Sequence, residues 1–287
     1  MSWFNLLTLI VIASALALPG LFLVLRNMAM VSDAISHTVL LGIILGYLIV
    51  PDLQSPILIL MAALVGVLTV LCIEFLVQKN FTSNDAATGI IFPFFFALAV
   101  ILLSKYLRNV HIDLDCVIMG DITFADFNLV KIASIYLPIS LVYGLGMLVI
   151  CAIYITLFYK ELKLSCFDPE AFIMAGFSAT LINYSLTALV SLSAVVSFEI
   201  VGAILVVSFL VTPAATALLI TKRLRQALIV TILFAIFNSV VGYMLSITLN
   251  VSTSGMCATI AGLSFVITMA VTKVKKRKAQ RLDKNAA

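Results

Sequence analysis

Long apolar segments recur from one end of this chain to the other, and they constrain its fold more than any other feature. A helix that spans a bilayer needs about 20 consecutive, predominantly apolar residues. The segments that meet this requirement centre on 5–25, 31–50, 56–77, 87–106, 133–159, 177–196, 200–220, 227–248 and 255–272. The sequence therefore predicts an all-α polytopic membrane protein with about 8–9 transmembrane helices.

Composition excludes a soluble protein. The 287 residues are 63% hydrophobic and 10% charged, with a mean hydropathy of +1.24, whereas about a quarter of an average soluble domain is charged. No stretch between the apolar segments is long enough for a separate domain, so we expect one transmembrane domain over 1–287. The first segment has no basic residues before it, which favours a retained span over a cleaved signal peptide.

One boundary is poorly marked. The segments 177–196 and 200–220 nearly fuse, and the expected break lies at Ser197, Phe198 and Glu199. Glu199 would then lie at the outer end of a helix over 197–221, in an entrance or at the level of the lipid headgroups. Gly202, Pro213 and the small residues that follow Pro213 suit a helix that lines a pathway or a subunit contact.

Basic residues predict the orientation, because cytoplasmic loops carry an excess of Lys and Arg. With the N-terminus outside, only Lys105, Arg108 and Lys131 of the 17 basic residues lie outside, and the other 14 face the cytoplasm. The basic tail 273–287 is then cytoplasmic. We interpret it as an anchor beside anionic membrane lipid, in preference to a nucleic-acid patch.

The five cysteines form no framework. Cys72, Cys151 and Cys257 lie in apolar segments, and Cys116 and Cys166 stand alone in loops. This odd, scattered set provides neither a disulfide pattern nor the CxxC spacing of zinc sites.

The second apolar segment carries the most unusual pair, Asp33 and His37. Ionisable residues within membrane spans are costly and tend to be functional. A spacing of four places both side chains on one face of a helix. His37 lies roughly 16 Å along the axis from Arg26, near the middle of the membrane. Three interpretations remain open from the residues alone, namely structural packing, a proton relay, and a site for a divalent cation such as zinc, iron or manganese.

Residues 160–176 are polar and cytoplasmic in this topology. Asp168 suits an N-cap, Pro169 the first helical position, Glu170 the positive end of the helix dipole and Gly176 the end of the turn. The segment therefore predicts a short helix between two spans, which either rests on the membrane surface or is presented to a cytoplasmic protein.

The longest outer loop is acidic. It carries five potential cation ligands, which either gather cations or belong to an ordinary solvated loop: His111, Asp113, Asp115, Asp121 and Asp126.

The sequence contains no recognisable ATP-binding or catalytic motif. There is no GxxxxGK[ST] loop, no nucleophile–base pair and no HExxH motif. If the protein pumps a solute, the energy must therefore come from a partner protein or from an ion gradient. An intramembrane metalloenzyme is disfavoured, because it would need more metal ligands than Asp33 and His37, and the chain has only two histidines.

Several motifs, in order over residues 20–225, resemble those of the metal-ion permease family of ATP-binding cassette importers. They are SDAISHTVLLGIILGYLI, NDAATGIIF, LDCVIMGDI, FDPEAFIMAG and SFEIVGAILVVSFLVTPAATALLIT. Ser32 and Thr38 depart from the family's usual residues in the second helix, and Phe172 and Ile173 in the coupling segment.

This resemblance implies a permease similar to type II importers, in a bacterial plasma (inner) membrane. It implies a second permease copy (homo- or heterodimer), cytoplasmic ATPase subunits, and an extracytoplasmic metal-binding protein that delivers the ion. The chain itself would be neither an enzyme nor the holder of a permanent cofactor.

In this family the aspartate and histidine of the second helix, here Asp33 and His37, are the expected metal ligands. Independently of the resemblance, Asp121 in the acidic outer loop and Glu199 are candidates for the pathway or its entrance. The expected ATPase contacts lie in the coupling segment: Phe167, Asp168, Pro169, Glu170 and Gly176. An oxygen-rich site without a thiol favours Mn²⁺ over Zn²⁺ or Fe²⁺ as the transported ion. The alternative is a gradient-driven secondary metal transporter.

Overall fold

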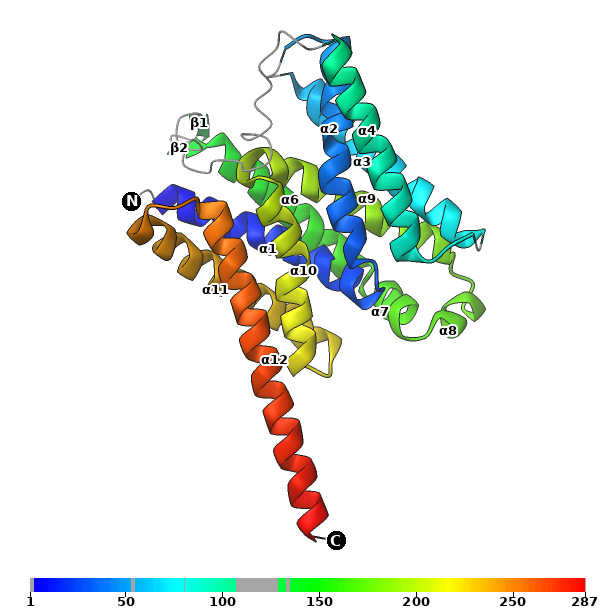
Figure 1. Cartoon of the computed structure of the whole chain (residues 1–287), viewed down its shortest axis with the longest axis vertical. Helices are drawn as coiled ribbons and strands as arrows, with labels where there is room; N and C mark the ends of the chain where they lie inside the picture. Colours follow the sequence, from blue (N-terminus) through cyan, green and yellow to red (C-terminus); the bar gives the residue numbers. More distant parts are fainter. Residues whose placement is uncertain (1–2, 53–54, 80, 107–128, 133–134, 287) are drawn as a thin grey trace.

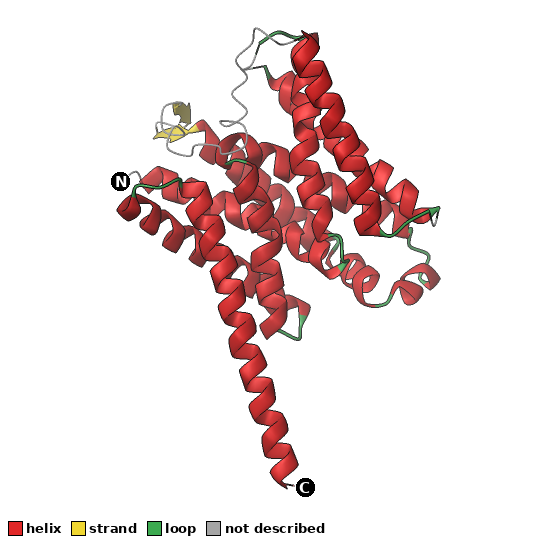
Figure 2. Ribbon diagram, viewed as in Figure 1, coloured by secondary structure: helices red, strands yellow, loops and turns green. Residues whose placement is uncertain are grey.

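A computed structural model describes residues 3–52, 55–79, 81–106, 129–132 and 135–286, which are almost entirely helical (Figures 1 and 2). Nine helices in these ranges are long and apolar enough to span a membrane. This confirms the predicted all-α polytopic fold. The nine are α1 (Trp3–Leu25), α2 (Ala29–Ile49), α3 (Pro56–Gln78), α4 (Asn84–Tyr106), α6 (Ile139–Leu157), α9 (Ala179–Val201), α10 (Ala203–Ile220), α11 (Leu224–Leu249) and α12 (Thr253–Ala286).

Four short elements complete the described chain. Two small helices, α7 (Tyr159–Phe167) and α8 (Pro169–Met174), connect α6 to α9. The strands β1 (Leu129–Ile132) and β2 (Ile135–Pro138) form an antiparallel hairpin just before α6. The sequence predicted one short helix in this connection and no hairpin.

Helix α1 lies at the centre of the bundle. It packs against α6, α9, α10 and α11. Of the 18-residue apolar stretch that qualifies α1 as a membrane span, 83% is buried inside the protein. Leu9 and Leu16 on one side of the helix and Phe22 on another are fully buried. A helix that is apolar all round is typical of a buried position. At Gly20 the backbone of α10 approaches so closely that a Cβ would collide with the carbonyl of Leu210.

Helices α2, α3 and α4 pack together beside this core (Figure 1). Gly42 and Gly46 of α2 face the backbone of α3, and a Cβ at Gly42 would overlap the backbone of Ala62. The Thr69 hydroxyl donates to the Thr38 hydroxyl across the same contact, at 3.0 Å. Small residues let transmembrane helices approach closely. The spacing of Gly42 and Gly46 therefore fixes α2 against α3.

The break between the sixth and seventh spans lies at Gly202, so the expected position at Ser197, Phe198 and Glu199 is wrong. All three residues lie inside α9. Gly202 has φ 79° and ψ 165°, a conformation that is essentially restricted to glycine. The chain therefore changes direction where the backbone permits it, a few residues after the polar residues that suggested a boundary.

The fifth span begins later than predicted. The apolar segment 133–159 was expected to be helical throughout, but Ile135–Pro138 form a strand and α6 starts at Ile139. Pro138 has no N–H to donate inside a helix and is tolerated at its start, which accounts for the shorter span.

The predicted tail continues the last span. Helix α12 runs for 34 residues from Thr253 to Ala286 and extends beyond the rest of the protein (Figure 1). Only 11% of the corresponding apolar stretch of α12 is buried inside the protein. The basic segment 273–287 is thus helical up to Ala286.

The close α2–α3 contact predicts the effect of a single methyl group. Gly42→Ala should destabilise the purified protein by about 1–3 kcal/mol, as overpacking does in dense cores. The matched control is Gly146→Ala in α6, where a Cβ meets nothing within 4 Å and alanine favours the helix. Thermal unfolding in detergent measures both. Equal melting temperatures for the two variants would contradict the assigned packing.

Candidate metal site

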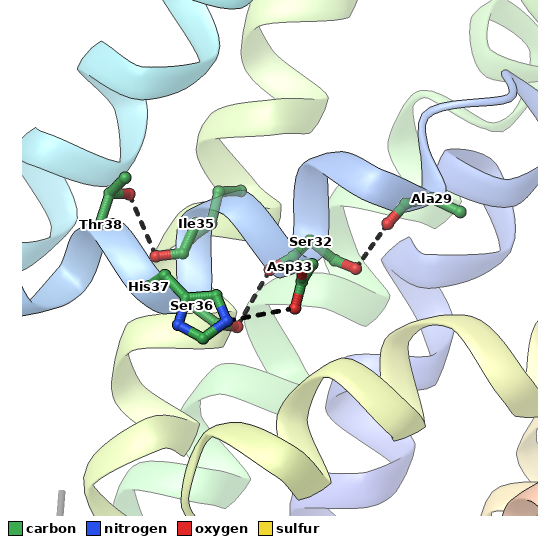
Figure 3. A network of polar contacts seen from close by, with 7 residues as sticks. All are labelled: Ala29, Ser32, Asp33, Ile35, Ser36, His37 and Thr38. Atoms are coloured by element: carbon green, nitrogen blue, oxygen red, sulfur yellow. Dashed lines mark hydrogen bonds and ion pairs between the residues drawn. The ribbon is translucent and has the colours of Figure 1, made fainter. Parts of the chain in front are cut away.

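Asp33 and His37 lie side by side on one face of α2 (Figure 3). The Oδ1 atom of Asp33 and the Nε2 atom of His37 are 3.5 Å apart. Their side chains are 44% and 39% exposed, respectively, although they belong to a helix that is otherwise largely buried. The predicted placement of the two residues on one helix face is confirmed.

The separation of these two atoms suits a shared metal ion. At metal–ligand distances of about 2.1 Å, two ligand atoms of a tetrahedral ion lie about 3.4 Å apart. The observed 3.5 Å is close to that value, so the two atoms are near enough to each other to share one cation. Carboxylate oxygen and imidazole nitrogen together suit manganese, iron and zinc.

The buried side of α2 has its hydroxyl groups satisfied locally. Ser32 donates to the carbonyl of Ala29 at 2.7 Å, Ser36 to that of Ser32 at 3.0 Å, and Thr38 to that of Ile35 at 3.2 Å (Figure 3). Hydroxyls that bond within their own helix need no partner on another helix. The two remaining polar side chains of this stretch, Asp33 and His37, instead pair with each other at 3.5 Å.

Two aromatic residues of α4 pack against His37. Its ring centroid lies 5.0 Å from that of Phe92 and 6.1 Å from that of Phe96. These contacts restrict the imidazole orientation and place an apolar wall beside the candidate site. Sequence reasoning missed both residues as part of the site, although their spacing of four matches that of Asp33 and His37 and could have suggested a facing helix.

Asp33 and His37 do not form a complete site by themselves. Within the described residues, no group of three or more His, Cys, Asp or Glu side chains is placed to hold a metal. A tetrahedral ion needs four ligands. The exposed pair would therefore need further ligands from outside the described residues or from water.

The other candidate pathway residues stay predictions. Glu199 lies in α9, three residues before Gly202, but its side chain is not among those described. Asp121 lies outside the described residues, as do His111, Asp113, Asp115 and Asp126.

The predicted helix after Asp168 is present as α8. The Asp168 carboxylate accepts a hydrogen bond from the backbone N–H of Ala171 at 3.0 Å, and Pro169 is the first helical residue. The exposed fraction of Phe167, just before this cap, is 60%, and Glu170 is also exposed. Their predicted role as ATPase contacts stays a prediction, whereas the capped helix itself is confirmed.

Gly176 ends this segment with φ +81°. The N–H of Phe177 donates to the carbonyl of Phe172 at 3.4 Å, and the two rings stack with centroids 5.3 Å apart. This is the Schellman arrangement, in which glycine takes the left-handed position and apolar residues pack around it. Phe172 is fully buried, so α8 is fastened firmly to the bundle.

Comparison with known proteins identifies a single family over nearly the whole chain. The family model described as "ABC 3 transport family" matches residues 3–272. The zinc transport system membrane protein TroD of Treponema pallidum is 42% identical over 90% of this chain and 70% of its own length. The manganese transport system membrane protein MntD of Bacillus subtilis is 40% identical over 89% of this chain and 87% of its own length.

The fold matches a solved structure as well. PsaBC from Streptococcus pneumoniae, in complex with Fab, aligns with a TM-score of 0.75 and 27% identity, over 92% of this chain and 89% of that one. The two curated relatives are thus named for different metals, and the solved structure shares the fold of this chain.

The cap of α8 gives a local prediction. Asp168→Ala should weaken the short helix by about 1 kcal/mol, because an N–H at its start loses its acceptor. Asp168→Ser keeps an acceptor without the charge and serves as the control. Hydrogen exchange of the amides in 169–177 measures the difference. Unchanged exchange in the alanine variant would show that the cap does not hold this segment.

Proposed function

Because this chain belongs to the ABC 3 transport family and is a metal-ion importer permease, we propose that it carries Mn²⁺, in preference to Zn²⁺ or Fe²⁺, on Asp33 and His37. The geometry of this pair is the observation that supports the proposal most. One carboxylate oxygen and one imidazole nitrogen lie 3.5 Å apart, half exposed, on a spanning helix. The oxygen-rich ligand set favours manganese.

The site becomes complete in a dimer of permeases. A second copy, or a related permease chain, would add its own carboxylate and imidazole to give four ligands near the dimer axis. The exposure of both side chains in the single chain supports such a shared site. With two ligands from each subunit, the ion is released when the subunits move apart.

The energy comes from partner subunits in this proposal. ATPase subunits dock on the cytoplasmic side at α8, and an extracytoplasmic metal-binding protein delivers the ion from outside. The N-terminus lies outside and the C-terminus in the cytoplasm. The firm attachment of α8 through Phe172 and Gly176 supports its use as a coupling element, since a loose segment would not transmit movement.

The transport cycle follows from these parts. ATP binding and hydrolysis in the partners move α8, and the bundle alternates between states in which the α2 site faces outward and inward. Asp33 and His37 replace part of the water shell of the ion while it crosses the hydrocarbon region. The ion is cargo in this cycle, and no resident cofactor takes part.

Loss of either ligand tests the assignment. Asp33→Ala and His37→Ala should each reduce uptake of radioactive manganese by at least about tenfold, since even second-shell changes at metal sites cost 10–100-fold in affinity. Leu48→Ala, at an exposed position of the same helix, should transport normally. Uptake is measured in cells that express all subunits, with radioactive zinc in parallel.

The same experiment separates the alternatives. Normal manganese uptake by both variants would exclude Asp33 and His37 as the site. Zinc uptake without manganese uptake would reverse the metal preference. Uptake by the chain alone in vesicles without ATP would instead indicate a gradient-driven transporter, in which the capped helix α8 has no role.

A further inference from the structure

The turn between α1 and α2 places Arg26 rigidly. The N–H of Met28 donates to the carbonyl of Leu23 at 3.0 Å, and that of Asn27 to Val24 at 3.1 Å. Asn27 is left-handed, with φ 58°. These bonds form a Schellman turn in which Asn27 takes the left-handed position and Arg26 is the C-cap residue that directly follows α1. Helix α2 begins three residues later at Ala29, so a movement of Arg26 is passed directly to the helix that carries the metal site.

The side chain of Arg26 connects this turn to two other helices. One terminal nitrogen donates to the hydroxyl of Ser165 in α7 at 2.8 Å, and the other to the amide oxygen of Asn183 in α9. The Nε atom is buried and has no partner. A guanidinium with five donors is always charged, and here it has only neutral acceptors.

A buried carboxylate shares the same pocket. Glu74 of α3 is only 5% exposed, and both its oxygens are buried without a hydrogen-bond partner. It lines a pocket of about 430 Å³ together with Arg26. Among the described residues that line this pocket, Arg26 is the one cation and Glu74 the one anion: Leu25, Arg26, Asn27, Met28, Glu74, Val77, Gln78, Asn84, Ser165, Cys166, Pro169, Phe172 and Asn183.

A buried, charged carboxylate without a partner is strongly unfavourable, so such a group is either neutralised or paired with a nearby cation. We propose that Arg26 is a positioning residue with two alternative partners, Ser165 with Asn183 in the state described here and Glu74 in a second state. The exchange moves the α1–α2 turn away from α7 and toward α3. It thereby changes the position of α2.

The pocket also contacts the coupling segment. Pro169 and Phe172 of α8 line it, next to Ser165 and Cys166 of α7. A displacement of α8 therefore alters the surroundings of Arg26 directly. This part rests on the proposed function, since it links the ATPase contact on α8 to the metal helix through one guanidinium group.

The partner exchange can be tested on the full chain alone, without ATPase subunits. Cys166 lines the pocket and is a free, partly exposed thiol. Its alkylation rate, read by peptide mass spectrometry in nanodiscs, reports the opening of the pocket on the α7 side. Removing both present acceptors with Ser165→Ala and Asn183→Ala releases Arg26, and alkylation should accelerate by roughly threefold or more, as expected within one hydrogen-bond network.

The role of Glu74 is tested by a third substitution, added to the double variant that carries Ser165→Ala and Asn183→Ala. Adding Glu74→Gln removes the second partner and should return the rate to near the native value. Adding Lys79→Gln, an exposed position just after the same helix, should leave the accelerated rate unchanged. An acceleration that is independent of Glu74, or no acceleration, would overturn the exchange.

Transport gives a second readout. Glu74→Gln should reduce manganese uptake roughly tenfold, within the range of coupling between distant sites, while manganese binding to the purified importer, with both permease subunits present, stays native because Glu74 is not a ligand. Native uptake by this variant would show that the exchange has no part in transport. If the native importer takes up no manganese, the proposed function fails, but the alkylation result still decides the exchange.

Discussion

The hydrocarbon core of a membrane contains no water, so every polar group there must find its partner within the protein. The described chain follows this constraint closely. Its backbone is helical across the described spans, and hydroxyls such as those of Ser14 and Ser239 donate to carbonyls one turn back at 2.8 Å. Against this background, the polar groups that are exposed or left without partners are informative. Asp33 and His37 are partly exposed and pair with each other, whereas both oxygens of Glu74 are buried without a hydrogen-bond partner.

Shape then decides which helices meet, because lipid tails are as apolar as leucine and the hydrophobic effect does not drive spans together. Glycines permit the closest approaches, at Gly20 between α1 and α10 and at Gly42 between α2 and α3. The first contact fixes α1 against α10, and the second fixes α2 against α3. The turn that contains Arg26 joins α1 to α2, so the position of α2 is limited by its neighbour α3 and by this turn.

Much of this organisation could be predicted from the sequence, because it rests on short-range patterns. Apolar length predicted the spans, and the spacing of Asp33 and His37 predicted their common face. Asp168, Pro169 and Gly176 predicted the start and the end of α8. The break at Gly202 was missed because the polar residues before it resemble a boundary, and the dihedral angles of a glycine leave no trace in composition.

Contacts between residues far apart in the chain could not be predicted from the sequence either. Glu74 is a single acidic residue in an apolar segment, and nothing along the sequence shows that it is buried beside Arg26, 48 positions away. Phe92 and Phe96 resemble lipid-facing residues until α4 is placed against His37.

The length of α12 has a consequence for the space around the protein. Thirty-four residues form a rod of about 51 Å at 1.5 Å per residue, whereas the hydrocarbon core is about 30 Å thick. Since the C-terminal part carries the lysines and arginines, that part leaves the hydrocarbon. Helix α12 therefore projects roughly 20 Å beyond the hydrocarbon core. Proteins that bind to this surface must fit around the projecting helix.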